Sequence, residues 1–257
     1  MNSQLKNGSV LKNVFESIKD LVDQGTFICS KRGVEFKTLD SSHIVYIHIS
    51  MKKGGFEKFS CEKENGETTF SADITTMIKV LKWIKGGEEL EWNVTEDKME
   101  FVIGEDKAKK FNLRLIDLEY EELEISEIDY DCKLTMSTSD FSTTFKDLSL
   151  FSDDVMIKTN DDNELVLSVS GIIGDGSVII KNDCSTTIDI KDSFNLKYSL
   201  PYILNFTKAS SLADNVTIYF SNNSPAIFEY KIEKYGFLKF YLAPKDSDVD
   251  SDDEDYL

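Results

Sequence analysis

Long apolar runs are absent from this sequence. No stretch approaches the roughly 18 consecutive apolar residues that a membrane-spanning helix needs. The first six residues also lack the apolar segment of a secretory signal peptide. We therefore expect a soluble, intracellular protein.

Cysteine, histidine and the common catalytic motifs are also scarce. The 4 cysteines stand singly, and the only histidines are His43 and His48, so no zinc site is expected. No nucleophile-elbow, P-loop or dinucleotide-binding motif occurs, and the glycine-rich residues 171–176 predict a turn. Acidic residues are plentiful, but nothing in the sequence places two carboxylates across a cleft. We expect no catalysis, no metal and no cofactor.

The chain does have enough apolar and aromatic residues for a globular fold. Its 257 residues are 40% hydrophobic and include 17 Phe and 10 Tyr. This length fits one large domain or two domains of about 128 residues. The 47 acidic and 29 basic residues give a net charge of −18, which taken alone argues against nucleic-acid binding.

Four segments have the apolar spacing of amphipathic helices. Apolar residues recur at intervals of three and four in residues 9–22, 72–84, 139–150 and 199–209. Ser9 is expected to cap the first helix, and Pro201 suits the first turn of the fourth. Strand-like runs occupy residues 44–49, 91–95, 98–103, 111–115, 165–170, 177–181, 216–220, 226–232 and 238–242.

The order of these patterns indicates an internal duplication. Lys19-Asp20-Leu21 recurs as Lys146-Asp147-Leu148, Lys82 matches Lys208, and Leu113 matches Phe240, at offsets of 126 or 127 residues. A fixed internal period outweighs other fold predictions. We expect an N-terminal domain at 1–117, a connecting loop at 118–132 and a C-terminal domain at 133–245.

Charge is distributed unevenly along the chain. Residues 117–131 and the terminal segment 246–257 are strongly acidic and contain no basic residue, which predicts an extended linker and a disordered tail. In contrast, each helical pattern carries outward lysines, which on their own are typical of any solvated helix face. These residues are Lys12, Lys19, Lys79, Lys82, Lys146 and Lys208.

Several motifs resemble the proliferating cell nuclear antigen family of DNA sliding clamps. They are Leu39-Asp-Ser-Ser-His43, the helix 8–14, the segment 205–209, the acidic connector 118–130 and the final Leu242-Ala-Pro-Lys245. The resemblance runs from about residue 8 to residue 245. It implies an α+β fold of two similar clamp domains, with helices inside and antiparallel sheets outside a closed ring of three chains.

The resemblance also gives the helix lysines a function. The six lysines would face a central channel and contact the phosphates of double-stranded DNA without reading its sequence. Thr143 and Pro201 stand where many relatives have arginine, so this channel would be less basic per subunit.

A second implied site binds partner peptides. The family docks DNA polymerase, clamp loader, ligase and nuclease through a Q-x-x-hydrophobic-x-x-aromatic-aromatic motif, whose anchors enter an apolar pocket beside the connector. The matching positions are Leu39, His43, Ile44, Tyr46, Leu123, Ile125, Tyr130, Pro225, Tyr241, Ala243 and Pro244.

The third implied site joins the subunits. A strand near the end of the first domain would pair with a strand of the next chain's second domain and remove two exposed sheet edges. The residues concerned are Lys109, Lys110, Phe111, Leu113, Ser177, Val178, Ile179 and Ile180.

These features predict a homotrimeric clamp without catalytic activity, acting in DNA replication and repair. The alternatives are a subunit of a heterotrimeric checkpoint-type clamp and, much less favoured, a carboxylate enzyme. The expected location is the nucleus, or a viral replication site if a virus encodes the chain. No membrane association is expected.

Overall fold

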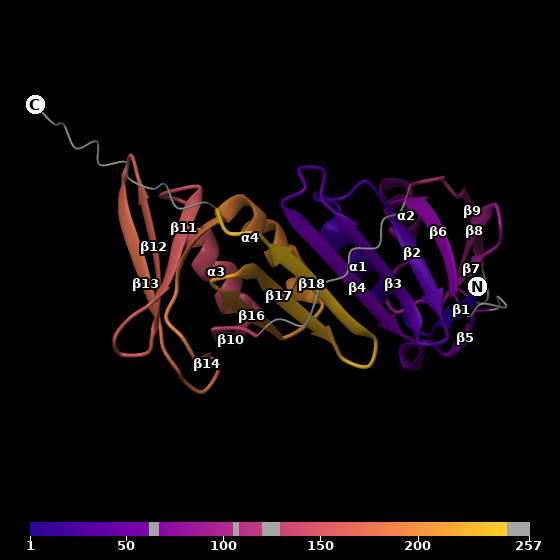
Figure 1. The fold of residues 1–257 in the computed structure, drawn as a ribbon. Coiled ribbons are helices and arrows are strands. Elements are labelled where there is room, and N and C mark those ends of the chain that lie inside the picture. The colour runs from indigo at the N-terminus through magenta and orange to yellow at the C-terminus, as the bar shows by residue number, and fades with distance from the viewer. Residues whose placement is uncertain (62–66, 105–107, 120–128, 246–257) are drawn as a thin grey trace, which may run out of the picture.

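The structure is a computed structural model that describes residues 1–61, 67–104, 108–119 and 129–245. The molecule is elongated, with the two halves of the chain side by side (Figure 1). Its helices are α1 (Ser9–Ile18), α2 (Ile74–Leu81), α3 (Thr138–Leu148) and α4 (Leu200–Phe206), with 3-10 turns η1 (Lys53–Gly55) and η2 (Thr207–Ser211). In the described ranges, none of the helices has the length and apolar content to cross a membrane.

Three antiparallel sheets contain all the named strands. The five-stranded sheet has the order β5 (Lys58–Ser60), β1 (Asn2–Leu5), β7 (Leu90–Val94), β8 (Lys98–Ile103) and β9 (Lys109–Arg114). The four-stranded sheet has the order β13 (Gly174–Ile180), β12 (Leu165–Gly171), β11 (Asp154–Thr159) and β15 (Asn195–Ser199). The nine-stranded sheet has the order β14 (Thr187–Ile190), β10 (Cys132–Ser137), β16 (Asn215–Ser221), β17 (Ser224–Ile232), β18 (Gly236–Leu242), β4 (Val45–Lys52), β3 (Gly33–Leu39), β2 (Gln24–Ser30) and β6 (Glu67–Asp73).

The same element order occurs twice, from β1 to β9 and again from β10 to β18. Each half contributes one five-stranded and one four-stranded set of strands. In the middle of the molecule, the five-stranded set of the second half joins the four-stranded set of the first half. The joint is the antiparallel pairing of β18 with β4, from Gly236 opposite Met51 to Leu242 opposite Val45.

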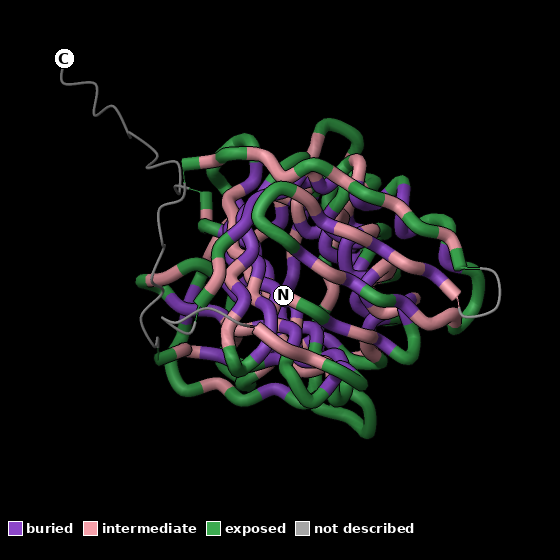
Figure 2. Tube along the Cα trace, turned by 90° about the vertical axis from the view of Figure 1, so that its right-hand side faces the viewer, coloured by how far each residue is buried: buried purple, intermediate pink, exposed green. Residues whose placement is uncertain are grey.

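One continuous core runs through both halves. Buried residues line the facing surfaces of helices and sheets, and exposed residues gather in the turns (Figure 2). Aromatic side chains fill much of this core. The rings of Phe206 and Phe240, for example, stack with centroids 4.4 Å apart. Full burial of one such side chain contributes about 1.5–3 kcal/mol.

The four expected helices are present, but each is shorter than its apolar pattern. Leu21, Val22 and Ile84 are buried in turns that follow the helices, so their apolar character does not mark helix. Ser9 is not a cap, because α1 is preceded by Gly8 and the Ser9 hydroxyl donates to the carbonyl of Gly86. Pro201 does lie in the first turn of α4.

The predicted strands are also present, and residues 171–174 form the expected turn between β12 and β13. Two details of the duplication need correction. Because α1 ends at Ile18 and α3 ends at Leu148, Lys19-Asp20-Leu21 corresponds to Ser149-Leu150-Phe151 and not to residues 146–148. Strand pairing places Phe111 opposite Phe101, and Phe240 opposite Phe228. Phe111, rather than Leu113, is therefore the structural counterpart of Phe240.

Candidate functional site

The helix surfaces carry the predicted lysines at different exposures. Lys19, Lys79, Lys82 and Lys146 are exposed on or just after α1, α2 and α3. Lys12 is half-buried, and its Nζ donates to the carbonyl of Ile84 at 3.3 Å. Four of the six lysines are thus open to solvent and free to contact a phosphate backbone.

Lys208 is engaged at the junction between the two halves. Its Nζ lies 2.7 Å from Oδ2 of Asp20, which follows α1, and it also contacts Asn205. The hydrogen bond from Lys208 lowers the pKa of Asp20 from its ordinary value. Lys208 therefore offers less free charge than its place in the sequence indicates.

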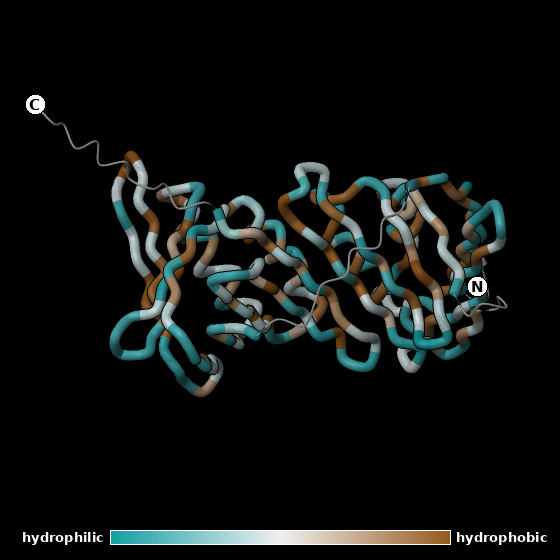
Figure 3. Tube along the Cα trace, viewed as in Figure 1, coloured by the Kyte–Doolittle hydropathy of each residue, from teal (hydrophilic) through white to brown (hydrophobic). Residues whose placement is uncertain are grey.

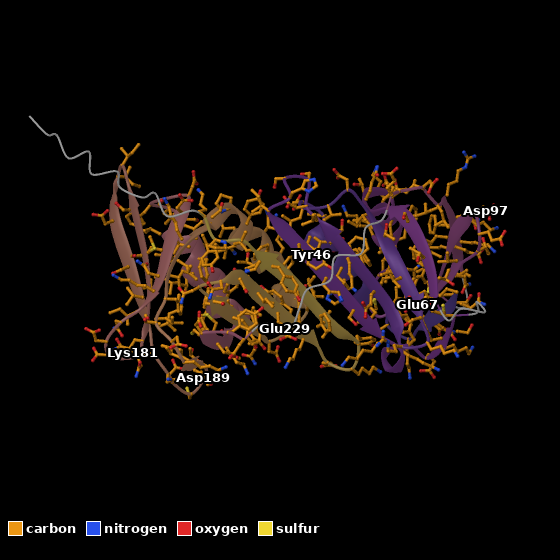
Figure 4. All side chains as sticks on the ribbon, viewed as in Figure 1. Tyr46, Glu67, Asp97, Lys181, Asp189 and Glu229 are labelled. Atoms are coloured by element: carbon orange, nitrogen blue, oxygen red, sulfur yellow. The ribbon has the colours of Figure 1, made fainter. Side chains whose placement is uncertain are left out.

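A small aromatic cluster lies on the opposite face of the nine-stranded sheet, where β18 meets β4. It comprises Tyr46, Ile227 and Tyr241, with Leu39, Tyr130 and Tyr219 packed against it. The rings of Tyr46 and Tyr241 are 5.5 Å apart, and those of Tyr130 and Tyr219 are 5.1 Å apart. Figure 4 labels Tyr46 and Glu229 on this part of the sheet.

The turn between β3 and β4 has a geometry fixed by Asp40. Its carboxylate accepts hydrogen bonds from the amides of Ser42, Ile44 and Val45 at 2.7–3.1 Å. Burial raises the pKa of Asp40, but the hydrogen bond from the Ser42 hydroxyl and these backbone bonds offset that effect and leave its pKa below the ordinary value. His43 adopts a positive φ of 59°, which directs the chain round the turn and leaves Ile44 exposed. The Leu39–His43 motif is therefore a preformed turn beside the aromatic cluster.

The other predicted pocket residues divide into two groups. Pro225, Ala243 and Pro244 lie at the ends of β17 and β18, next to the pair Ala226 and Leu242. Leu123 and Ile125 fall outside the described residues. The structure adds Ile227 and Tyr219, which the sequence analysis did not include. Their alternation with core residues along β16 and β17 is the signal that could have identified them.

A buried carboxylate borders the aromatic cluster. Glu229 is only 7% exposed, accepts a hydrogen bond from the Tyr219 hydroxyl at 3.1 Å and lies 3.8 Å from Lys239 Nζ. Burial, followed by the charges of Tyr241 and Tyr219, raises the pKa of Tyr130. The buried Tyr130 hydroxyl has no hydrogen-bond partner within the described residues. The cluster thus combines an apolar surface with polar groups at its border.

Both ends of the molecule expose a sheet edge. β9 is the last strand of the five-stranded sheet, and β13 is the last strand of the four-stranded sheet. Large exposed apolar residues occur in the two halves that contain these edges. Trp83 packs 5.7 Å from the Phe111 ring near β9, and Leu150, Phe151, Ile172, Ile173 and Ile179 belong to the half that contains β13. Figure 3 shows the apolar tip of the β12–β13 hairpin at the upper left of the molecule.

Two family models match the chain and together cover its described folded part. The proliferating cell nuclear antigen N-terminal domain matches residues 1–131, and the C-terminal domain matches residues 124–245. The chain belongs to the proliferating cell nuclear antigen family. It is therefore a protein of the DNA sliding clamp family with the clamp fold, and members of this family are non-enzymatic scaffolds.

The two halves of this clamp chain differ where the aromatic cluster lies. By strand pairing, Leu39 and Tyr46 in β3 and β4 correspond to Ser170 and Asp175 in β12 and β13. The corresponding surface of the second half is a cavity of about 590 Å³ lined by Ser170, Asp175, Asp154 and Lys197, among others. Of these two equivalent surfaces, the one in the first half carries the aromatic cluster, whereas serine, aspartate and lysine side chains contribute much of the lining in the second half.

Proposed function

We propose that this chain forms a homotrimeric ring that encircles duplex DNA. In this role it acts as a processivity factor for DNA polymerase and as a docking platform for replication and repair proteins. The observation that carries the proposal is that the two strands paired in the internal joint have counterparts at the two free sheet edges of the chain. β9 is the counterpart of β18, and β13 is the counterpart of β4.

Pairing β9 with β13 of another copy would build a second nine-stranded sheet in the same strand order as the first. Phe240 lies opposite Ile47 in the internal joint, and the β13 residue at the position of Ile47 is Gly176. Phe111 should therefore lie opposite Gly176 of the next subunit. Such head-to-tail contacts close into a ring when the rotation between subunits allows it. The family resemblance supports closure at three subunits.

The helices supply a matching contact. Lys208 and Asp20 pair across the internal joint. The counterpart of Lys208 is Lys82, because the same number of residues separates each from the start of its helix, at Leu200 and Ile74. The counterpart of Asp20 is Leu150, because each lies two residues after the end of its helix, at Ile18 and Leu148. Leu150 is a large exposed apolar residue, so the contact between subunits would be apolar at the position where Asp20 carries a charge in the internal joint. Exposed Trp83 would be covered at the same joint.

The helices of such a ring would line its channel. Lys12, Lys19, Lys79, Lys82, Lys146 and Lys208 lie on or beside these helices, and Lys19, Lys79 and Lys146 are both exposed and unassigned to a joint. Exposed lysines suit weak, sequence-independent phosphate contacts, which a sliding ring needs.

The aromatic cluster and the Asp40 turn form the proposed docking site for partner peptides. DNA polymerase, clamp loader, ligase and nuclease would bind it through the motif described above, with anchors against Tyr46, Tyr241 and Ile44.

The domain boundaries follow the same proposal. We assign residues 1–117 to the first domain, 118–132 to the connector, 133–245 to the second domain and 246–257 to the tail. The site of action would be the nucleus or a viral replication site.

A heterotrimeric clamp is the second candidate. It would require that the two free edges of this chain face two different proteins. The correspondence of these edges to the internal joint favours pairing between identical chains instead. The acidic connector and the aromatic cluster favour a general docking clamp over a dedicated checkpoint subunit.

Topological retention on DNA tests the proposed function. The clamp is loaded on nicked circular DNA, and the circle is then cut once with a restriction enzyme. We expect the protein to remain on the circle through a salt wash and to leave after the cut, because a ring slides off free ends. Equal retention on circular and linear DNA would contradict the proposal.

A further inference from the structure

A cluster of basic residues stands out on a molecule whose net charge is −18. Three neighbouring segments contribute to it. They hold Lys31 and Arg32 between β2 and β3, Lys52 and Lys53 where β4 ends and η1 begins, and Lys234 between β17 and β18. All five side chains are exposed, and no ion pair is recorded for any of them in the described part of the chain. Glu233 is the only acid within these segments. We call these five residues the basic rim.

Backbone contacts hold the three segments together. The amide of Lys53 donates to the carbonyl of Arg32, and the amide of Lys52 donates to the carbonyl of Tyr235, each at 2.7 Å. Gly33 and Gly236 have φ angles of 146° and 136°. A Cβ at either glycine would lie 2.0 Å or less from a carbonyl oxygen of β4. The segments are therefore closely packed, and their backbones present the five cations at fixed positions.

The basic rim is separate from the surfaces already described. It lies at the ends of β3 and β4 opposite the Asp40–Ile44 turn, along the lower edge of the molecule in Figure 1. It spans both halves, because β18 and β4 pair beside it. A ring of three chains would carry three such clusters on one of its faces.

We propose that the basic rim binds the phosphate backbone of nucleic acid where it leaves the ring. This inference rests on one part of the proposed function, namely that DNA passes through the channel of the ring. Long, exposed lysine side chains can contact the phosphates of a flexible nucleic-acid backbone through charge attraction, which does not require a pocket of defined shape. Half-buried Tyr235, with Lys234 Nζ 5.3 Å from its ring centroid, adds an aromatic group of the kind found in single-strand binding surfaces. The rim would give the two faces of the ring different affinities for DNA.

Anisotropy of labelled single-stranded and duplex DNA tests this proposal on the full chain. The rim variant is Lys52→Glu/Lys53→Glu. The matched control is Lys133→Glu/Lys158→Glu, which makes the same charge change at two exposed lysines of the second half. We expect the rim variant to lose at least about threefold in affinity at low salt. The slope of log K against log salt should fall by about 1–2, at roughly 0.9 per phosphate contact for duplex DNA.

The control should keep both the affinity and the slope. A rim variant indistinguishable from the control would overturn the inference, whether both retain DNA or both lose it equally. Loss of poly-glutamate binding with unchanged DNA binding would also overturn it, in favour of an acidic protein partner. A larger loss for single-stranded or for duplex DNA identifies which form the rim contacts.

Two further variants separate a loss of DNA binding at the basic rim from other effects of the substitutions. Lys31→Gln/Arg32→Gln, which adds no negative charge, should weaken DNA binding in the same direction. If it has no effect, the inference is wrong. The channel variant Lys79→Glu/Lys146→Glu reports on the proposed function. If it loses topological retention while the rim variant binds DNA normally, only the rim inference fails.

Discussion

Single residues distinguish the aromatic cluster of the first half from the equivalent surface of the second half. Leu39 and Tyr46 in the first half are replaced at equivalent positions by Ser170 and Asp175 in the second. The fold is thus duplicated, whereas of these two equivalent surfaces one carries the aromatic cluster. Ile44 and Ile172 offer a comparison at this scale, since both are exposed in the turn that joins equivalent strands.

We predict that Ile44→Ala weakens binding of a motif peptide by roughly 1–3 kcal/mol, the range for loss of an anchor contact. The turn should survive because Asp40 holds it through backbone amides. Titration calorimetry measures the effect, and Ile172→Ala serves as the control that should leave affinity unchanged. Equal affinities for all three proteins would place the peptide site elsewhere.

A second residue-scale prediction concerns acid stability. Contact with His48, whose Nε2 lies 3.4 Å from the Glu35 carboxylate, lowers the pKa of Glu35 to about 2, and the ion pair with Lys37 acts in the same direction. Because this pKa lies below the unfolded value of about 4.3, the stabilisation is present above that pH and is lost as pH falls towards 2. Its size is roughly 1 kcal/mol or less, since the carboxylate is partly exposed.

Glu35→Gln should therefore lower the free energy of unfolding near neutral pH, and the difference from wild type should shrink as pH approaches 2. Urea denaturation at a series of pH values measures this. Glu91→Gln on β7, also exposed, is the control and should show no such convergence. A difference independent of pH would refute the role of the Glu35–His48 pair.

At the scale of elements, the periodicity of apolar residues predicted the helices and many of the strands. The order of the strands in the sheets and the contacts between distant segments depend on tertiary pairing. The four helices followed from apolar spacing. Buried strands such as β2 and β3 were not predicted, because Phe27, Ile28 and Cys29 form a short run without clear alternation. The Lys208–Asp20 contact joins residues 188 apart in sequence, so only the fold could reveal it. The family resemblance implied that β9 and β13 are exposed sheet edges, and the strand order places both at the ends of their sheets.

The helix contact leads to a prediction about apolar packing. Leu150→Glu should weaken assembly, because it places a charge at the proposed joint, where exposed Trp83 would also be covered. Lys158→Glu on β11 changes an exposed residue away from both edge strands and should leave assembly unchanged. Sedimentation velocity at several concentrations measures the subunit equilibrium. Unchanged assembly of the Leu150→Glu variant would contradict the helix contact.

At the scale of the whole molecule, a negative net charge is compatible with DNA binding if the cations face the channel. Lys79→Glu/Lys146→Glu should reduce polymerase processivity to a similar degree on unrelated DNA sequences, because phosphate contacts do not read bases. Trimer mass and peptide affinity should persist. We expect the control Lys133→Glu/Lys158→Glu to retain processivity. A loss that depends on DNA sequence would contradict the channel assignment.

The central claim is that β9 and β13 join identical chains. In β13, the tight turn closed by Gly171 and Gly174 directs the Ile179 amide away from β12. Ile179→Pro should therefore spare the internal hairpin and remove a hydrogen bond of the joint, whereas Ile179→Ala retains the amide.

Light scattering coupled to size-exclusion chromatography measures this most directly. We predict 87.6 kDa, three times 29.2 kDa, for wild type, a mainly trimeric Ile179→Ala, and folded monomers of 29.2 kDa for Ile179→Pro. A wild-type mass of 29.2 kDa at all concentrations, or an Ile179→Pro variant that remains a trimer, would contradict the proposed joint.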